Sequence, residues 1–168
     1  MSLKYFTLVF PFNITGDQVL LGLKKRGLGE NLWNGFGGKP EKNESIEQCA
    51  RRELEEECGL VAKEMTYLGV LYINTTDGVG DIVIYVYTTR KYMGAVAESD
   101  EMLPEWFETT NLPYKQMYEE APLWYPVMLG NKKFTATFLF DNDDLISYEI
   151  TTKDELEMAE ILRMAQDI

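Results

Sequence analysis

The segment from Gly38 to Leu60, GKPEKNESIEQCARRELEEECGL, holds seven acidic residues, and four of them fall within five positions. Most of the segment has the pattern of one helix. Ser45 followed three residues later by Gln48 is a capping-box sequence, which favours a helix start. Gly59 is the residue type that commonly ends a helix, because glycine adopts the left-handed backbone conformation at little steric cost. We therefore expect one helix between Ser45 and Gly59, with a loop on either side.

The acidic residues of this helix gather on one edge. At 100° per residue, Glu53, Glu56 and Glu57 project within an arc of about 100°. Like charges three and four residues apart destabilise a helix, and Arg52 is spaced to offset only one of them. An apolar strip beside the acidic edge is formed by Ile46, Ala50 and Leu54. A glutamate-rich helix is ordinarily a solvated surface, but this pattern also suits a helix whose acidic edge borders a cleft.

The composition limits the class of protein. The chain has 168 residues, of which 45% are hydrophobic and 26% charged, so we expect one domain over residues 1–168. No apolar run approaches the ~18–20 residues that a membrane span needs, and no signal peptide is recognisable. Cys49 and Cys58 lie too far apart in the predicted helix for a disulfide, and two free thiols suit a reducing compartment. We expect a cytoplasmic monomer with no membrane partner.

Charge and the lack of histidine narrow the chemistry. The formal net charge is −12, from 28 acidic and 16 basic residues, which would repel a nucleic acid polymer. The chain has no histidine, which excludes Ser-His and Cys-His nucleophilic catalysis. A general base must then be a carboxylate, a lysine, a tyrosine or metal-bound hydroxide. A small anionic ligand remains compatible with the charge where a divalent metal bridges it to carboxylates.

The rest of the chain has the pattern of an α/β domain. We expect a hairpin of strands 4–13 and 18–27 around the turn 14–17, and a glycine-rich loop before the acidic helix. The later segments are predicted as strands 65–76 and 81–92, a short strand beginning in 105–113, one or two short helices in 114–130, and a hairpin of 132–140 and 145–151. Residues 152–168 are helical by period, with an apolar stripe formed by Met158, Ile161, Leu162 and Ala165.

The acidic segment also matches a specific motif. It fits G-x5-E-x7-R-E-U-x-E-E-x-G-U, where U is a bulky aliphatic residue, at Gly38, Glu44, Arg52, Glu53, Leu54, Glu56, Glu57, Gly59 and Leu60. At average residue frequencies such a match arises by chance on the order of once in 10⁹ to 10¹⁰ positions. The segment therefore resembles the Nudix box, and the chain resembles the Nudix (MutT-type) hydrolases. The resemblance implies an α/β/α sandwich with a mixed central sheet, and hydrolysis of nucleoside diphosphates linked to another group with Mg²⁺ or Mn²⁺.

The resemblance also implies roles for single residues. The metal ligands would be the carbonyl of Gly38 and the carboxylates of Glu53, Glu56, Glu57 and Glu101, the last from a later loop. Glu56 is alternatively a member of the network that activates water. Arg52 would orient the site by pairing with Glu44 or Glu56, and Glu44 would be structural. Hard oxygen ligands suit Mg²⁺, which polarises a phosphoryl group and activates water without histidine. We expect Glu57→Gln to lower turnover by orders of magnitude and to leave folding nearly intact.

Similarity outside the box points to one branch of this family, the eukaryotic oxidised-purine nucleoside triphosphatases. Segments such as LWNGFGGK, LPYKQM and WYPVML carry it, over roughly residues 4–150. Residues 152–168 are then an extension that caps the domain or binds a partner. By position, Asn34 would read the base, and Thr7 and Lys24 would line the same pocket. Tyr118 would stack on the base, and Glu120 would read its edge; a shift of one residue makes Glu119 and Glu120 the reading pair.

The pocket also departs from that branch. Ala121 falls where a second aspartate is expected, and Leu28, Ile73 and Thr75 replace aromatic residues. The sequence therefore predicts a metal-dependent hydrolase that converts nucleoside triphosphates, oxidised purines above all, to monophosphate and pyrophosphate. Two alternatives stay open: a Nudix hydrolase of another nucleoside diphosphate derivative, such as a dinucleotide or nucleotide sugar, and a non-catalytic nucleotide-binding module.

Overall fold

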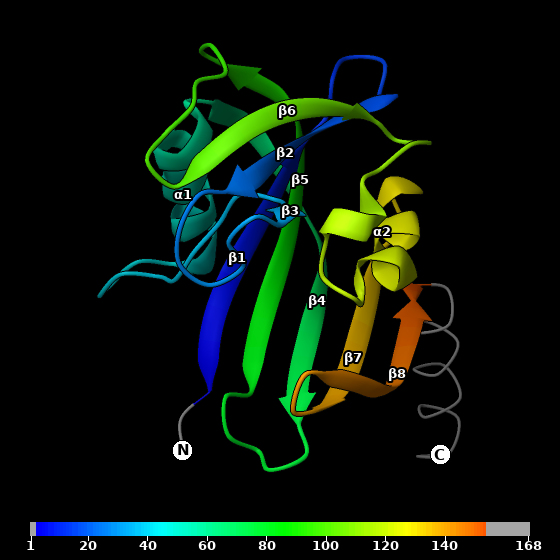
Figure 1. The fold of residues 1–168 in the computed structure, drawn as a ribbon. Helices are drawn as coiled ribbons and strands as arrows, with labels where there is room; N and C mark the ends of the chain where they lie inside the picture. The colour runs from blue at the N-terminus through cyan, green and yellow to red at the C-terminus, as the bar shows by residue number, and fades with distance from the viewer. Residues whose placement is uncertain (1–2, 154–168) are drawn as a thin grey trace, which may run out of the picture.

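The computed structural model describes residues 3–153, and it contains two sheets and two α-helices (Figure 1). The five-stranded sheet has the order β1-β5-β4-β7-β8, and the three-stranded sheet has the order β3-β2-β6. The elements are β1 (Lys4–Pro11), β2 (Gln18–Lys24), β3 (Trp33–Asn34), α1 (Ile46–Cys58), β4 (Val61–Thr75), β5 (Ile82–Met93), β6 (Met102–Glu108), a 3-10 turn (Tyr114–Gln116), α2 (Ala121–Leu129), β7 (Phe134–Asp141) and β8 (Asp144–Thr152).

The central sheet is mixed, as predicted. β1 runs parallel to β5 and β4 runs parallel to β7, whereas the β4–β5 and β7–β8 pairs are antiparallel. The predicted hairpin of β7 and β8 is confirmed, and it continues to Thr152, which pairs with Phe134. The predicted C-terminal extension therefore starts after Thr152 at the earliest. Its helix and its apolar stripe lie outside the described residues.

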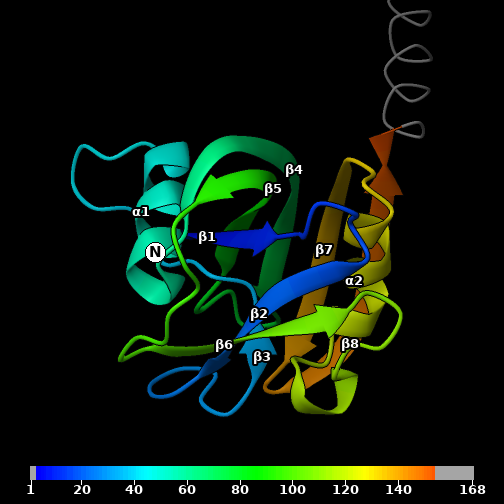
Figure 2. The ribbon, with the colours of Figure 1, turned by 90° about the horizontal axis from the view of Figure 1, so that it is seen from above.

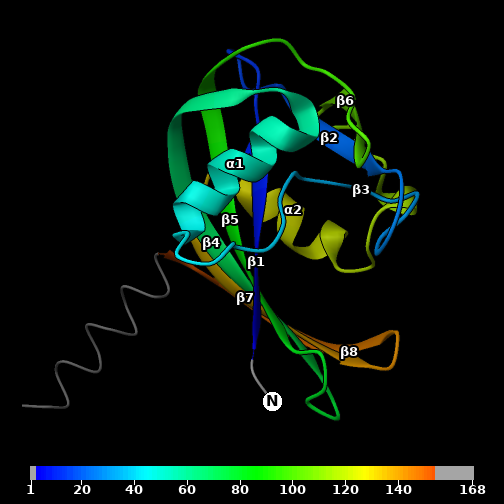
Figure 3. The same ribbon diagram turned by 90° about the vertical axis from the view of Figure 1, so that its left-hand side faces the viewer.

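The two helices cover opposite faces of this sheet (Figure 2). Side chains alternate along a strand, so Val9 and Phe10 of β1 face opposite sides. Val9 is buried in a cluster with Leu54 of α1, whereas Phe10 packs edge-on against Trp124 and Tyr125 of α2. Figure 3 views the molecule from the side of α1, which lies in front of strands β1, β4 and β5. This arrangement is the predicted α/β/α sandwich.

The predicted hairpin of β1 and β2 is wrong. The two strands lie in different sheets, and a single bridge between Phe12 and Val19 joins them. β1 instead pairs with β5, and its other edge is occupied by the loop before α1, where Phe36 forms a bridge with Val9. β2 pairs with β3 and β6. The turn after β1 is therefore present, but both edges of β1 are filled by segments distant in the sequence.

The caps of α1 are as predicted. Ser45 and Gln48 form both hydrogen bonds of the capping box, and Gly59 ends the helix with φ 82° and an N–H that donates to the carbonyl of Glu55. Cys49 and Cys58 are free and buried. Residues 3–153 include no helix that is long and apolar enough to cross a membrane.

Candidate active site

The glycine loop before α1 holds the acidic helix against β1. The N–H of Thr7 donates to the carbonyl of Gly38 at 2.9 Å, and the N–H of Gly37 donates to the Glu57 carboxylate at 2.8 Å. A Cβ at Gly37 would lie 1.7 Å from the carbonyl oxygen of Thr7, so only glycine fits there. A Cβ at Gly38 would lie 2.6 Å from the Glu53 carboxylate. The loop therefore touches both β1 and the acidic edge of α1.

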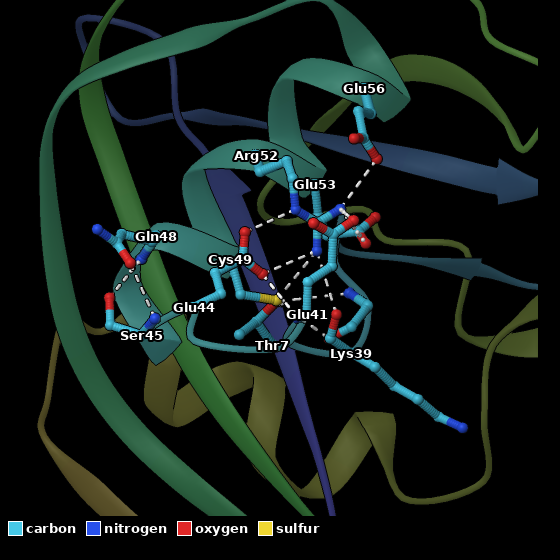
Figure 4. A network of polar contacts seen from close by, with 11 residues as sticks. Thr7, Lys39, Glu41, Glu44, Ser45, Gln48, Cys49, Arg52, Glu53 and Glu56 are labelled. Atoms are coloured by element: carbon cyan, nitrogen blue, oxygen red, sulfur yellow. Dashed lines mark hydrogen bonds and ion pairs between the residues drawn. The ribbon is translucent and has the colours of Figure 1, made fainter.

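Arg52 organises the exposed end of this edge (Figure 4). Its Nε and Nη2 donate to the two oxygens of Glu44 at 2.7 and 2.9 Å. Its Nη1 donates to Glu53 at 2.9 Å and to Glu56 at 3.1 Å, and Nη2 also donates to the carbonyl of Lys39 at 3.1 Å. The hydrogen bonds from Arg52 lower the pKa of Glu44 to about 2. Arg52 thus pairs with both of its predicted partners, and Glu44 has a contact that fits the predicted structural role.

Glu57 is the buried carboxylate of the helix, and Glu53 beside it is half-buried. Glu57 is 4% exposed, and burial raises its pKa to about 7. Burial also raises the pKa of Glu53, against the opposing effect of Arg52. Within residues 3–153, each carboxylate has one oxygen in a hydrogen bond and a second oxygen in none. Two adjacent desolvated carboxylates with open oxygens are a site that a cation would stabilise.

These residues fit a hard divalent cation such as Mg²⁺, which prefers oxygen ligands and keeps several waters. They do not form a prebuilt cage: no group of three or more acidic or other ligating side chains is assembled within residues 3–153. Glu56 is exposed and held by Arg52. The carbonyl of Gly38 already accepts the N–H of Thr7, whereas no residue of the described chain donates to the carbonyl of Gly37. Gly37 is therefore a second backbone candidate, which the motif alone did not single out.

The structure does not bring Glu101 into contact with the helix carboxylates. Its side chain pairs with Lys24 at 3.3 Å and with Arg26 at 2.8 Å, and these two cations lower its pKa, Arg26 first. Its carbonyl accepts the N–H of Lys25, which ties the loop to the end of β2. Arg26 was not foreseen, because the sequence gives no spacing that links it to Glu101.

A cavity of about 660 Å³ lies beside this edge and is lined by all five predicted substrate-binding residues, Thr7, Lys24, Asn34, Tyr118 and Glu120. The lining also includes Gly37 and Gly38 of the glycine loop, which lie next to the Glu57 and Glu53 carboxylates, so the cavity adjoins the acidic edge. Burial raises the pKa of Glu53 and Glu57, and the positive charge of Lys24 is a smaller, opposing effect on both.

The far wall of the cavity contains both candidate glutamates. Glu119 is exposed, whereas Glu120 is half-buried and its pKa is raised by burial. Ala121 also lines the cavity. So do the three non-aromatic replacements and two of the three tryptophans, which are Leu28, Ile73, Thr75, Trp33 and Trp124. The half-buried position favours Glu120 as the group that meets a ligand.

One wall residue that sequence reasoning did not single out is Tyr125 of α2. Its hydroxyl donates to the Asn34 Oδ1 atom at 2.6 Å, and the two residues are 91 positions apart. Tyr125 belongs to the segment WYPVML, which carries part of the family resemblance, but no local sequence pattern indicates a contact with Asn34.

Comparison with known proteins agrees with this geometry. A sequence model of the family described as "NUDIX domain" matches residues 6–129. The chain is 41% identical over 143 residues to the "Oxidized purine nucleoside triphosphate hydrolase" of Danio rerio, covering 85% of this chain and 90% of that protein. It is 35% identical over 152 residues to the protein of the same name from Mus musculus, covering 90% and 96%. A solved MutT protein from Bacillus halodurans superposes with a TM-score of 0.77 at 25% identity, covering 88% of this chain and 97% of that chain.

Proposed function

The chain belongs to the Nudix hydrolase family, and on that premise we propose that it hydrolyses oxidised purine nucleoside triphosphates to the monophosphate and pyrophosphate. The observation that supports the proposal is that the cavity adjoins the acidic edge. Gly37 and Gly38 line the cavity, the N–H of Gly37 donates to Glu57, and a Cβ at Gly38 would lie 2.6 Å from the Glu53 carboxylate. A base held between Asn34 and Tyr118 would therefore extend its phosphates toward α1. The names of the two vertebrate relatives support the same substrate.

We propose that Mg²⁺, with Mn²⁺ as a substitute, is held by Glu53, Glu57 and a backbone carbonyl of the glycine loop. Glu56 and Glu101 are the proposed further ligands, and Glu101 would have to leave its ion pairs to reach the site. A bound divalent cation supplies neutralisation of phosphate charge and a nucleophilic water near neutral pH. The open oxygens of two desolvated carboxylates support this assignment.

The chain's own side chains would hold the carboxylates, bind the phosphate and accept the proton. Arg52 holds Glu53 and Glu56 in fixed positions, so the carboxylates need little reorganisation during the reaction. Lys24 lines the cavity and pairs with Glu101, and its ammonium would bind a phosphate oxygen of the substrate. Water attacks an internal phosphorus, the bond to the pyrophosphate oxygen breaks, and a carboxylate of the acidic edge accepts the water's proton. Glu56 is the exposed candidate for that acceptor. The aromatic face of Tyr118 would stack on the base.

A substrate panel tests the proposal. Pyrophosphate release with Mg²⁺ would be measured for dGTP, 8-oxo-dGTP, 2-hydroxy-dATP, dCTP, ADP-ribose and a diadenosine polyphosphate. The highest kcat/KM on an oxidised purine triphosphate would support it. Turnover confined to the last two compounds would overturn the substrate and keep the reaction class, and tight binding without metal-dependent turnover would indicate a non-catalytic module.

We further propose that the protein acts as a monomer on the cytoplasmic nucleotide pool and binds no nucleic acid polymer. The net charge of −12 supports the last point. Size-exclusion chromatography with light scattering would test the monomer, because a dimer would double the measured mass.

A further inference from the structure

The amide of Asn34 is held in one orientation by two donors. The Oδ1 atom accepts the backbone N–H of Gly35 at 2.9 Å and the hydroxyl of Tyr125 at 2.6 Å. If the amide were turned over, its NH₂ group would face the N–H of Gly35, and two donors would meet. The hydrogen-bond network therefore assigns the oxygen to the side of Gly35 and Tyr125, and the NH₂ group to the other side.

Tyr125 is a suitable group for holding that orientation. The residue is 1% exposed and sits in an aromatic cluster with Phe10 and Trp124 around its ring. Burial raises the pKa of Tyr125 well above its ordinary range, and the charge of Glu120 adds to the effect, so the hydroxyl stays protonated. A buried hydroxyl that loses its acceptor carries a desolvation cost. Rotation of Asn34 would impose that cost, and the rigid ring keeps the donor in place.

The held amide gives this wall of the cavity a defined polarity. Asn34 lines the cavity, and its NH₂ group makes no hydrogen bond with residues 3–153. Both N–H bonds are therefore available to a ligand. Glu120 lines the same cavity, and when ionised a carboxylate can only accept hydrogen bonds. The edge of a 6-carbonyl purine carries an acceptor next to a ring N–H donor, whereas a 6-amino purine carries the reverse order.

We infer that Tyr125 is a positioning residue that fixes Asn34 as a hydrogen-bond donor to the base, so that this site selects purines with a carbonyl oxygen at C6 over those with an amino group. The inference rests on the proposed function, because it concerns the base of the same triphosphate substrate. It adds a residue of α2 whose hydroxyl would act on the base through Asn34.

The test compares two substrates by kcat/KM, 8-oxo-dGTP and 8-oxo-dATP, which share the oxidised ring and the triphosphate. In Tyr125→Phe the ring stays and only the hydroxyl is lost. The selectivity ratio should therefore fall about 3- to 10-fold, mostly because the guanine substrate binds less tightly and its KM rises. Asn34→Asp keeps an oxygen for both donors but presents an acceptor to the cavity. Its ratio should fall by at least about 10-fold, because a carbonyl and a carboxylate oxygen repel each other.

The matched control is Tyr114→Phe. Tyr114 packs edge-on to Tyr125 with ring centroids 6.4 Å apart, but it does not line the cavity and its hydroxyl does not bond Asn34. This variant should keep the parent ratio, and thermal unfolding of all variants would measure any loss of packing. A merely structural role for the Tyr125 hydroxyl would lower the melting temperature and leave the ratio unchanged.

The possible failures are distinct. A Tyr125→Phe ratio within twofold of the parent, with a reduced ratio for Asn34→Asp, would overturn the positioning role of Tyr125. An unchanged ratio in both variants would show that Asn34 does not face C6, and a parent that prefers 8-oxo-dATP would refute the assigned polarity. A parent that releases no pyrophosphate from any triphosphate would instead overturn the proposed function.

Discussion

Replacing Glu57 by glutamine should make the metal-free protein more stable while it removes activity. Burial raises the pKa of Glu57 from 4.5 to about 7. An acid whose folded pKa lies above its unfolded pKa loses stability as the pH rises between the two values, and the loss is complete above the folded pKa. Each tenfold change in proton affinity is worth about 1.4 kcal/mol, so the buried charge costs at most about 3 kcal/mol above pH 7.

Glutamine avoids this cost and keeps the main contact. Its side-chain oxygen can still accept the N–H of Gly37, which Glu57 accepts at 2.8 Å. We expect the variant to gain about 1–3 kcal/mol at pH 8 without metal, which is about 3–8 °C in melting temperature for a chain of this size. Pyrophosphate release should fall at least about 100-fold, because a carboxylate directed at the metal is lost. Because Glu57 is 4% exposed, we now expect a change in stability rather than folding that is nearly unaffected.

The assay is thermal unfolding at pH 5 and pH 8, with EDTA and with Mg²⁺, alongside pyrophosphate release. The stability gain should shrink at pH 5, where Glu57 is already largely protonated in the folded protein. Mg²⁺ should stabilise the parent more than the variant. Glu55→Gln is the matched control, since Glu55 is exposed on the same helix and its replacement also removes one negative charge.

Two results would refute this reasoning. If Glu57→Gln and Glu55→Gln had the same melting temperature at pH 8, the buried charge would not be a cost to folding. If the variant released pyrophosphate at the parent rate, Glu57 would have no part in catalysis.

Three further variants test the surrounding groups. In Gly38→Ala the new Cβ would lie 2.6 Å from the Glu53 carboxylate and would displace it. Turnover should fall about tenfold or more, with little change in melting temperature because this side chain is flexible; parent-like kinetics would contradict the role of Glu53. Arg52→Met should lower turnover. Because Arg52 lowers the pKa of Glu44 to about 2, the parent loses the stability of this pair as the pH falls from 4.5 toward 2, and the variant should lack that loss. Melting temperature against pH measures the difference, and an identical profile in parent and variant would argue against the Arg52–Glu44 coupling. Glu101→Gln should weaken the apparent affinity for Mg²⁺ about tenfold in a titration of activity, and an unchanged midpoint would leave Glu101 only its ion pairs.

The acidic helix was predictable because its determinants are local. The capping pair at Ser45 and Gln48 and the left-handed residue Gly59 set its ends. The i,i+4 spacing of Glu53 and Glu57 sets which side chains share an edge. Such features depend on neighbours within a few residues, and all of them appear in the structure where the sequence placed them.

Strand pairing was less predictable, because it depends on which segments reach an edge. The turn after β1 forms, yet β2 does not pair along β1, since the loop at Phe36 occupies that edge. β5 fills the other edge from more than 70 residues away, with Lys4 paired to Ile82. A turn signal reports only the local change of direction, and competition for an edge is settled by the packing of the whole sheet.

The state of each site residue was the least predictable property, and it decides the chemistry. Spacing placed Glu53 and Glu57 on one edge, but the oxygens left open to a cation follow from where Arg52 and the N–H of Gly37 donate. Likewise, position alone assigned Asn34 to the base, but an amide both donates and accepts. The N–H of Gly35 and the hydroxyl of Tyr125, 91 residues away, together hold its oxygen and leave the NH₂ group to donate. Substitutions that change base selectivity are therefore expected in α2 as well as among the residues that touch the base.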